Sequence, residues 1–181
     1  MSIFVGAEGF QLGNTFILTE LHLSVGDTDS TDYKHFVFKA PLLPFTAIER
    51  RSIRYCTRYL HQISWTEGNV PYSALVPIIK KMENATLYCY GYTTARFLRK
   101  LLPTSIIIDT QTEGYKMPTG IPSAPCFTTN ASRHFAASKA NAIRKYVINE
   151  TVQKASISRD IVDRMNFILY NSICDRATII I

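Results

Sequence analysis

Hydrophobic and polar residues alternate along the first 40 residues of the chain, a pattern typical of β-strands that bury one face. Strands are expected over 2–5, 15–25 and 33–40, and the alternation is clearest over 20–25. The segment 26–30, which contains Gly, Asp and Ser, is typical of a turn. We therefore expect an antiparallel meander of three strands.

Beyond residue 44 the apolar positions follow a helical period, which short β-type runs interrupt. In the first helix, Ile48, Tyr55, Cys56 and Tyr59 are the expected inward positions. Pro77 is expected to kink the second helix or to delay its start. We expect helices over 47–60, 72–82, 93–102, 132–148 and 159–170, and short β-type segments over 85–91, 105–109 and 177–181.

This order of elements predicts an α/β fold in which helices flank a mixed sheet that begins with the antiparallel meander. The 181 residues are enough for one domain with a full hydrophobic core. We expect that domain to span 1–150. Residues 151–181 are expected to form a C-terminal helix and an apolar tail, packed on the domain or on a neighbouring copy.

Composition indicates the cellular setting. Hydrophobic residues make up 46% of the chain and charged residues 19%, which is typical of globular proteins. The N-terminus lacks the pattern of a signal peptide, and no apolar run approaches the ~20 residues of a membrane span. The four cysteines form no CxxC pair, so reduced thiols are expected. We expect an intracellular, cytoplasmic protein with no membrane partner.

Three segments carry motif-like residues. The first strand region contains FVGAEGF with Glu8, residues 87–102 read LYCYGYTTARFLRKLL, and residues 133–145 read RHFAASKANAIRK with His134. These segments resemble the motifs of DEDD-type exonucleases, a family with a ribonuclease H-like fold. The resemblance implies a ribonuclease H-like mixed sheet over roughly 1–150. In active members it also implies carboxylates that bind two catalytic metal ions.

Most of the carboxylates that the resemblance implies are missing. Gly6 stands where the first motif has an acid two residues before Glu8, and Lys139 stands where the last motif has an Asp. The second motif region offers only Thr93, Thr94 and Ala95. Maelstrom-type domains are similar in lacking these acids. Over 79–146, ten basic residues stand against three acids, a net charge of +7. Because two-metal chemistry needs several carboxylates, we expect no enzymatic activity and no cofactor.

Cysteine and histidine leave two alternatives open. Glu8, His61, Cys126 and His134 together could form a zinc site, although their spacing fits no standard pair of ligands. Cys56 and His61 could form a nucleophile pair, but no acid is placed to orient the histidine. The alternative to both is a set of ordinary buried cysteines and partly exposed histidines.

Basic residues recur at positions that suit contacts with nucleic acid. Arg50, Arg54 and Arg58 follow one another at i, i+4 and i+8, so they share one face of the first helix. These residues could bind phosphates, and the alternative is a solvated helix face. The expected nucleic-acid-binding residues are Arg50, Arg54, Arg58, Arg96, Arg99 and Lys100.

Charge and composition also favour self-association. Residues 1–46 carry a net charge of −3, and this sign asymmetry with the basic middle suits head-to-tail packing of copies. The ten tyrosines suit contacts that are partly apolar and partly hydrogen-bonded. Ile179, Ile180 and Ile181 form an apolar, β-prone tail that would need cover. Our first hypothesis is a structural, self-assembling homo-oligomer of the viral-particle or occlusion-body type. The alternative is a non-catalytic nucleic-acid-binding domain.

Overall fold

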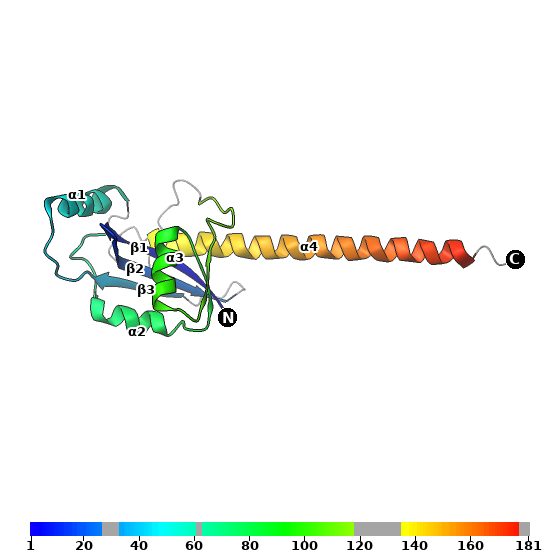
Figure 1. The fold of residues 1–181 in the computed structure, drawn as a ribbon, viewed down its shortest axis with the longest axis horizontal. Coiled ribbons are helices and arrows are strands. Elements are labelled where there is room, and N and C mark those ends of the chain that lie inside the picture. Colours follow the sequence, from blue (N-terminus) through cyan, green and yellow to red (C-terminus); the bar gives the residue numbers. More distant parts are fainter. Residues whose placement is uncertain (27–32, 61–62, 118–134, 178–181) are drawn as a thin grey trace. The chain divides into compact units, whose positions relative to one another are not determined.

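Six strands form one mixed sheet in the computed structural model, which describes residues 1–26, 33–60, 63–117 and 135–177. Their order across the sheet is β4-β3-β2-β1-β5-β6 (Figure 1). β1, β2 and β3 pair in an antiparallel meander, whereas β5 pairs in parallel with β1 and with β6. An α/β fold with an N-terminal meander is therefore confirmed. The strands are β1 (Ser2–Leu12), β2 (Thr15–Val25), β3 (Tyr33–Lys39), β4 (Val70–Pro71), β5 (Thr86–Cys89) and β6 (Ile106–Asp109).

Helices connect these strands and follow the last of them. Pro77 lies in the first turn of α2, where its missing N–H costs no intrahelical hydrogen bond, and the α-helix begins only after a 3₁₀ turn. In the described part of the chain, no helix has both the length and the apolar composition needed to cross a membrane. The helical segments are α1 (Ala47–Tyr55), its π-helical continuation η1 (Cys56–Leu60), the 3₁₀ turn η2 (Tyr72–Ala74), α2 (Leu75–Lys80), α3 (Tyr92–Leu101) and α4 (Phe135–Ala177).

The chain divides into two compact units, 1–144 and 145–181, so α4 contributes to both. In the first unit, α2 and α3 cover one face of the sheet, and α3 lies across β1 and β2 in Figure 1. Successive residues of a strand point to opposite faces, so the odd positions of β1 reach this core. The core under α2 and α3 includes Ile3, Val5, Ala7, Leu21, Leu23, Leu75, Ile79, Leu87, Ala95 and Leu98.

The opposite face of the sheet changes character along β1 and β2. A bulge breaks the pairing register after Glu8, so that Ile17 and Glu20, three residues apart, point to the same face. Near the hairpin tip this face is apolar: Phe10 and Ile17 pack with Trp65, whose ring centroid is 5.1 Å from that of Phe10. Beyond the bulge it becomes polar, and α4 begins there.

The inward face of α1 differs from the sequence prediction. Ile48, Tyr55 and Tyr59 are 81%, 55% and 59% exposed, so three of the four expected inward positions are wrong. Ile53 and Cys56 pack instead on the apolar cluster around Phe10 and Ile17. The apolar residues of this helix fall on two stripes, and hydrophobic periodicity alone does not show which stripe meets the sheet.

The separate helices predicted over 132–148 and 159–170 are wrong as two elements. α4 is a single helix over Phe135–Ala177. The intervening residues 149–158 contain neither Gly nor Pro, so nothing in them ends a helix. Ala177, expected in a β-type tail, is the last residue of α4, and residues 178–181 lie outside the described residues.

Candidate functional site

Two carboxylates face each other on the polar part of the sheet. Glu8 of β1 and Glu20 of β2 are direct partners in the antiparallel register, so their side chains lie on the same face. Glu20 is fully buried, whereas the side chain of Glu8 retains 14% exposure. The opposition of these two acids makes this the most acidic point of the described sheet, where a cation would be stabilised.

A lysine ammonium supplies positive charge at this point. Lys139 Nζ lies 2.5 Å from Glu8 Oε1. Ala136, Ala140 and Ile143 recur on the same side of α4 and are fully buried, so they fix this part of the helix, which includes Lys139, against the sheet. The residue that replaces an acid in the resembled motif is therefore the residue that neutralises Glu8.

Glu20 connects β3 to the start of α4. Its Oε1 lies 2.9 Å from His35 Nε2, and its Oε2 accepts a hydrogen bond of 3.2 Å from the backbone N–H of Ala136. That N–H belongs to the first turn of α4, where intrahelical acceptors are lacking and the helix dipole favours negative charge. Glu20 therefore acts as a buried anchor for the N-terminus of α4.

Burial raises the pKa of Glu8 above its ordinary value of 4.5. The ammonium of Lys139 opposes this shift through its charge and its hydrogen bond, and the neighbouring Glu20 adds to it. Desolvation is the largest of these four contributions. The ion pair with Lys139 therefore only partly offsets the cost of holding a charged Glu8 in this place.

Gly6 is fixed by the approach of α4. A Cβ at this position would lie 1.7 Å from the carbonyl oxygen of Ala136 and 2.6 Å from its carbonyl carbon. Both atoms belong to the helix backbone, which cannot rotate away as a side chain could. An acid at position 6, which the resembled motif would require, has no room in this arrangement.

These residues do not fit a pair of divalent cations. Hard cations such as Mg²⁺ need several oxygen ligands that are free to coordinate them. Here Glu8 pairs with the ammonium of Lys139, and Glu20 binds His35 and the backbone N–H of Ala136. In the described ranges, no group of three or more His, Cys, Asp or Glu side chains could hold a metal. Of the zinc set, only Glu8 is described; His61, Cys126 and His134 lie outside the described residues.

The remaining acid of the motif regions, Asp109, binds backbone groups. Its Oδ1 accepts hydrogen bonds from the N–H of Gly91 at 2.8 Å and of Gln111 at 3.1 Å. Gly91 precedes α3 with a φ of 95°, a left-handed conformation that favours glycine. Asp109 thereby ties the end of β6 to the turn that starts α3.

The arginines of the first helix are all exposed. Arg50 and Arg54 lie on α1, and Arg58 lies in the π-helical turn that follows, with its guanidinium carbon 5.3 Å from the ring centroid of Tyr59. The rings of Tyr55 and Tyr59 are 5.3 Å apart. Arginine and exposed tyrosine therefore lie together at this end of the helix.

Cys56 shows no sign of an activated nucleophile. Burial raises the pKa of its thiol, which lowers the fraction of reactive thiolate at neutral pH. Its expected partner, His61, lies outside the described residues.

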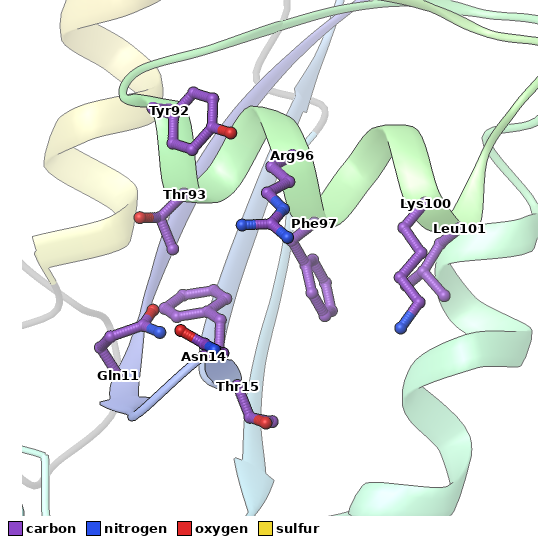
Figure 2. A pocket seen from close by; sticks show the side chains of 10 residues that line it. Gln11, Asn14, Thr15, Tyr92, Thr93, Arg96, Phe97, Lys100 and Leu101 are labelled. Atoms are coloured by element: carbon purple, nitrogen blue, oxygen red, sulfur yellow. The ribbon is translucent and has the colours of Figure 1, made fainter.

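The basic residues of α3 divide between two environments. Arg96 and Lys100 line a pocket between α3 and the β1–β2 hairpin (Figure 2). Arg99 instead donates a hydrogen bond of 3.1 Å to the carbonyl oxygen of Ile107 on β6. The structure thus brings two of the three expected α3 residues to one concave surface and places the third in a contact that supports the sheet.

Sequence reasoning missed Glu20 and the hairpin side of the pocket. Glu20 lies among apolar strand residues, and only the register with β1 places it opposite Glu8. Gln11, Asn14 and Thr15 are ordinary turn-flanking residues until the hairpin brings them beside α3. The expected assembly residues Ile179, Ile180 and Ile181 lie outside the described residues.

No protein-family model matches this chain, and no curated protein is significantly similar to it.

Proposed function

We propose that this chain is a non-catalytic nucleic-acid-binding protein, built on a ribonuclease H-like scaffold whose nuclease site has degenerated. The order of elements supports the scaffold: three antiparallel strands come first, and two parallel strands follow, with a helix between them. The six-stranded α/β sheet is common to many functions, so the site carries the proposal and the fold only accommodates it.

The ion pair between Lys139 and Glu8 is the single observation that carries the non-catalytic part of the proposal. Two-metal hydrolysis of a phosphodiester needs a cluster of carboxylates that hold divalent cations. The ammonium of Lys139 gives Glu8 one positive charge, but unlike a metal ion it cannot coordinate a phosphate oxygen or an attacking water. The helix backbone at Gly6 supports the same conclusion, because it fills the space of the missing first acid.

The binding part of the proposal rests on unbalanced positive charge. Arg50, Arg54 and Arg58 are exposed on one helical segment, and Arg96 and Lys100 line a pocket that contains no acid. Phosphate contacts from Lys and Arg release condensed counterions and give most of the affinity of non-specific nucleic-acid binding. A nuclease-like domain that keeps its phosphate contacts but lacks the metal site would bind nucleic acid without cleaving it.

Replacing Arg50, Arg54 and Arg58 together by Ala tests the binding role of α1. The affinity for a single-stranded oligonucleotide should fall, and the log–log salt slope should flatten by about 0.7 per lost phosphate contact. Fluorescence anisotropy of a labelled oligonucleotide over a salt series measures both quantities. A matched control replaces Lys34, Lys81 and Lys116, which are exposed in separate parts of the chain. Equal losses in both triple variants would show that α1 has no special role, and failure of the native chain to bind would contradict the proposed function.

A structural, self-assembling role is the second candidate, and the second unit favours it. Ile157, Ile161 and Met165 succeed one another at i, i+4 along α4 and are 59%, 53% and 57% exposed. An exposed apolar stripe on a helix is typical of pairing with another copy. This role would not need the 178–181 tail.

Light scattering of the full chain at neutral pH tests the second candidate. The native chain should have the mass of two or more chains. The double variant Ile157→Glu with Ile161→Glu should have the mass of a single chain. Gln153→Glu with Ser158→Glu, at exposed polar positions of the same helix, is the control. A native chain that is already monomeric would contradict this role.

A further inference from the structure

A pocket of about 420 Å³ lies between the tip of the β1–β2 hairpin and α3, within the first unit. In Figure 2, Arg96 and Phe97 extend from α3 toward the hairpin, Asn14 and Thr15 face them, and Gln11 and Lys100 lie toward opposite ends. This volume is within the range of pockets that hold small organic ligands. The lining residues are Gln11, Asn14, Thr15, Phe16, Tyr92, Thr93, Arg96, Phe97, Lys100 and Leu101.

The charge of the pocket is one-sided. Arg96 and Lys100 stand at i and i+4, so they lie on the same face of α3. None of the ten lining residues is acidic, and neither cation has an ion-pair partner among the described residues. Two unbalanced cations in a concave surface favour an anion there, and a guanidinium can donate two hydrogen bonds to one phosphate.

Aromatic and amide groups complete the pocket. Phe16 of β2 and Phe97 of α3 meet edge to face with ring centroids 5.6 Å apart, and this pair joins the hairpin to the helix. Tyr92 lines the same pocket and is 68% exposed, so most of its side chain is accessible to a ligand. The side chains of Asn14 and Thr15 add donors and acceptors. Stacking rings beside cations are the groups that bind single-stranded nucleic acids.

We propose that this pocket binds one nucleotide, with the phosphate on Arg96 and Lys100 and the base against Tyr92. The inference deepens the proposed function and rests on it for the source of the nucleotide, which is a single strand of nucleic acid. A free nucleotide has the same chemistry, and competition by adenosine 5′-monophosphate distinguishes it from a strand. The polar hairpin residues Asn14 and Thr15 face the bound nucleotide.

The test compares two double variants. The pocket variant combines Arg96→Ala with Lys100→Ala, and the charge-matched control combines Lys81→Ala with Lys116→Ala. Both control lysines are exposed and lie outside the pocket. The probes are a labelled 12-mer of thymidine nucleotides, adenosine 5′-monophosphate and adenosine. The pocket variant should bind the 12-mer at least about tenfold more weakly, because it loses the charge-assisted hydrogen bonds that both cations would make to the phosphate. The control should bind as the native chain does.

The mononucleotide arm identifies the phosphate and tests the pocket separately from the strand. Adenosine monophosphate should compete with the 12-mer for the native chain, whereas adenosine should compete far less. Tyr92→Ala should weaken the 12-mer and leave the salt slope unchanged, because it removes a stacking surface and no phosphate contact.

The outcomes separate the two proposals. If the 12-mer binds the native chain and the pocket variant equally well, the pocket inference is wrong and the proposed function stands. If the native chain binds only the mononucleotide, through Arg96 and Lys100, the pocket is a nucleotide site and the proposed nucleic-acid function is wrong. If the native chain binds neither the 12-mer nor adenosine monophosphate, the pocket inference and the proposed function are both wrong.

Discussion

Gly6 gives the sharpest constraint at the scale of single residues. Because its Cβ would meet the backbone of Ala136, Gly6→Ala should lower the free energy of unfolding by about 1–3 kcal/mol, the usual cost of overpacking, or by more. Gly6→Asp, which would restore the acid of the resembled motif, should destabilise further and add no metal affinity. Chemical denaturation measures the first effect.

Gly13 offers a control for this substitution. It has a φ of 56° at the hairpin tip, a conformation that Asn tolerates, and nothing lies near its missing Cβ. Gly13→Asn should therefore change stability little. If Gly6→Ala is as mild as Gly13→Asn, the close contact between β1 and α4 is wrong.

Glu8 predicts a specific dependence of stability on pH. Its pKa is raised in the folded state, so the folded chain binds more protons than the unfolded chain between pH 4.5 and the folded pKa. Stability from this group is therefore largest at low pH and falls as pH rises through that interval. Glu8→Gln removes the titration, so the stability difference between the native chain and the variant should fall over the same interval and then level off.

Denaturant midpoints of both proteins at a series of pH values from 4 to about 8 give this difference. The series begins near the ordinary carboxyl pKa, where the decrease should start. Subtracting the variant's free energy of unfolding from that of the native chain cancels the titration of every group that the substitution leaves unchanged. A difference that stays constant or grows as pH rises would contradict the burial of Glu8 described above.

At the scale of elements, Asp109 links β6 to the start of α3. Asp109→Ala leaves the N–H groups of Gly91 and Gln111 without their carboxylate acceptor and should cost about 1.5–3 kcal/mol of stability. Asp109→Asn keeps an acceptor oxygen and should recover most of the loss. Thermal denaturation of the two variants measures the comparison, and equal losses would show that the hydrogen bonds to Oδ1 are unimportant.

The elements also show which features a sequence can and cannot predict. The alternation over 20–25 correctly predicted β2, and short apolar runs predicted β5 and β6, because burial of these strands fixes their pattern. The same alternation is blurred before Glu20 by the bulge, which depends on pairing with β1. α1 was predicted in the right place, but its inward face depends on which stripe meets Phe10 and Trp65.

The candidate site was only partly predictable for the same reason. Glu8 and Lys139 were identified from the resembled motifs, but their ion pair depends on the docking of α4 on β1. Arg96 and Lys100 were identified from charge, whereas their pocket depends on the hairpin tip that faces them. Contacts between residues far apart in the chain determine these features, and local sequence patterns do not encode them.

At the scale of the whole molecule, the two units suit different roles. The first, 1–144, contains the sheet, the site around Glu8 and the basic pocket. The second, 145–181, is described as a helix to Ala177 and carries the exposed apolar stripe. Nucleic-acid binding by the first unit and pairing of copies through the second are compatible in one protein, since they use different residues.

We propose that this chain binds nucleic acid and does not cleave it, because the ammonium of Lys139 pairs with the carboxylate that a metal ion would need. The most direct measurement incubates the full chain with end-labelled single-stranded DNA and RNA in Mg²⁺ or Mn²⁺, then resolves the products on a denaturing gel. We predict that the labelled strands keep their full length at every time point. Metal-dependent shortening that disappears in Glu8→Ala would contradict this proposal.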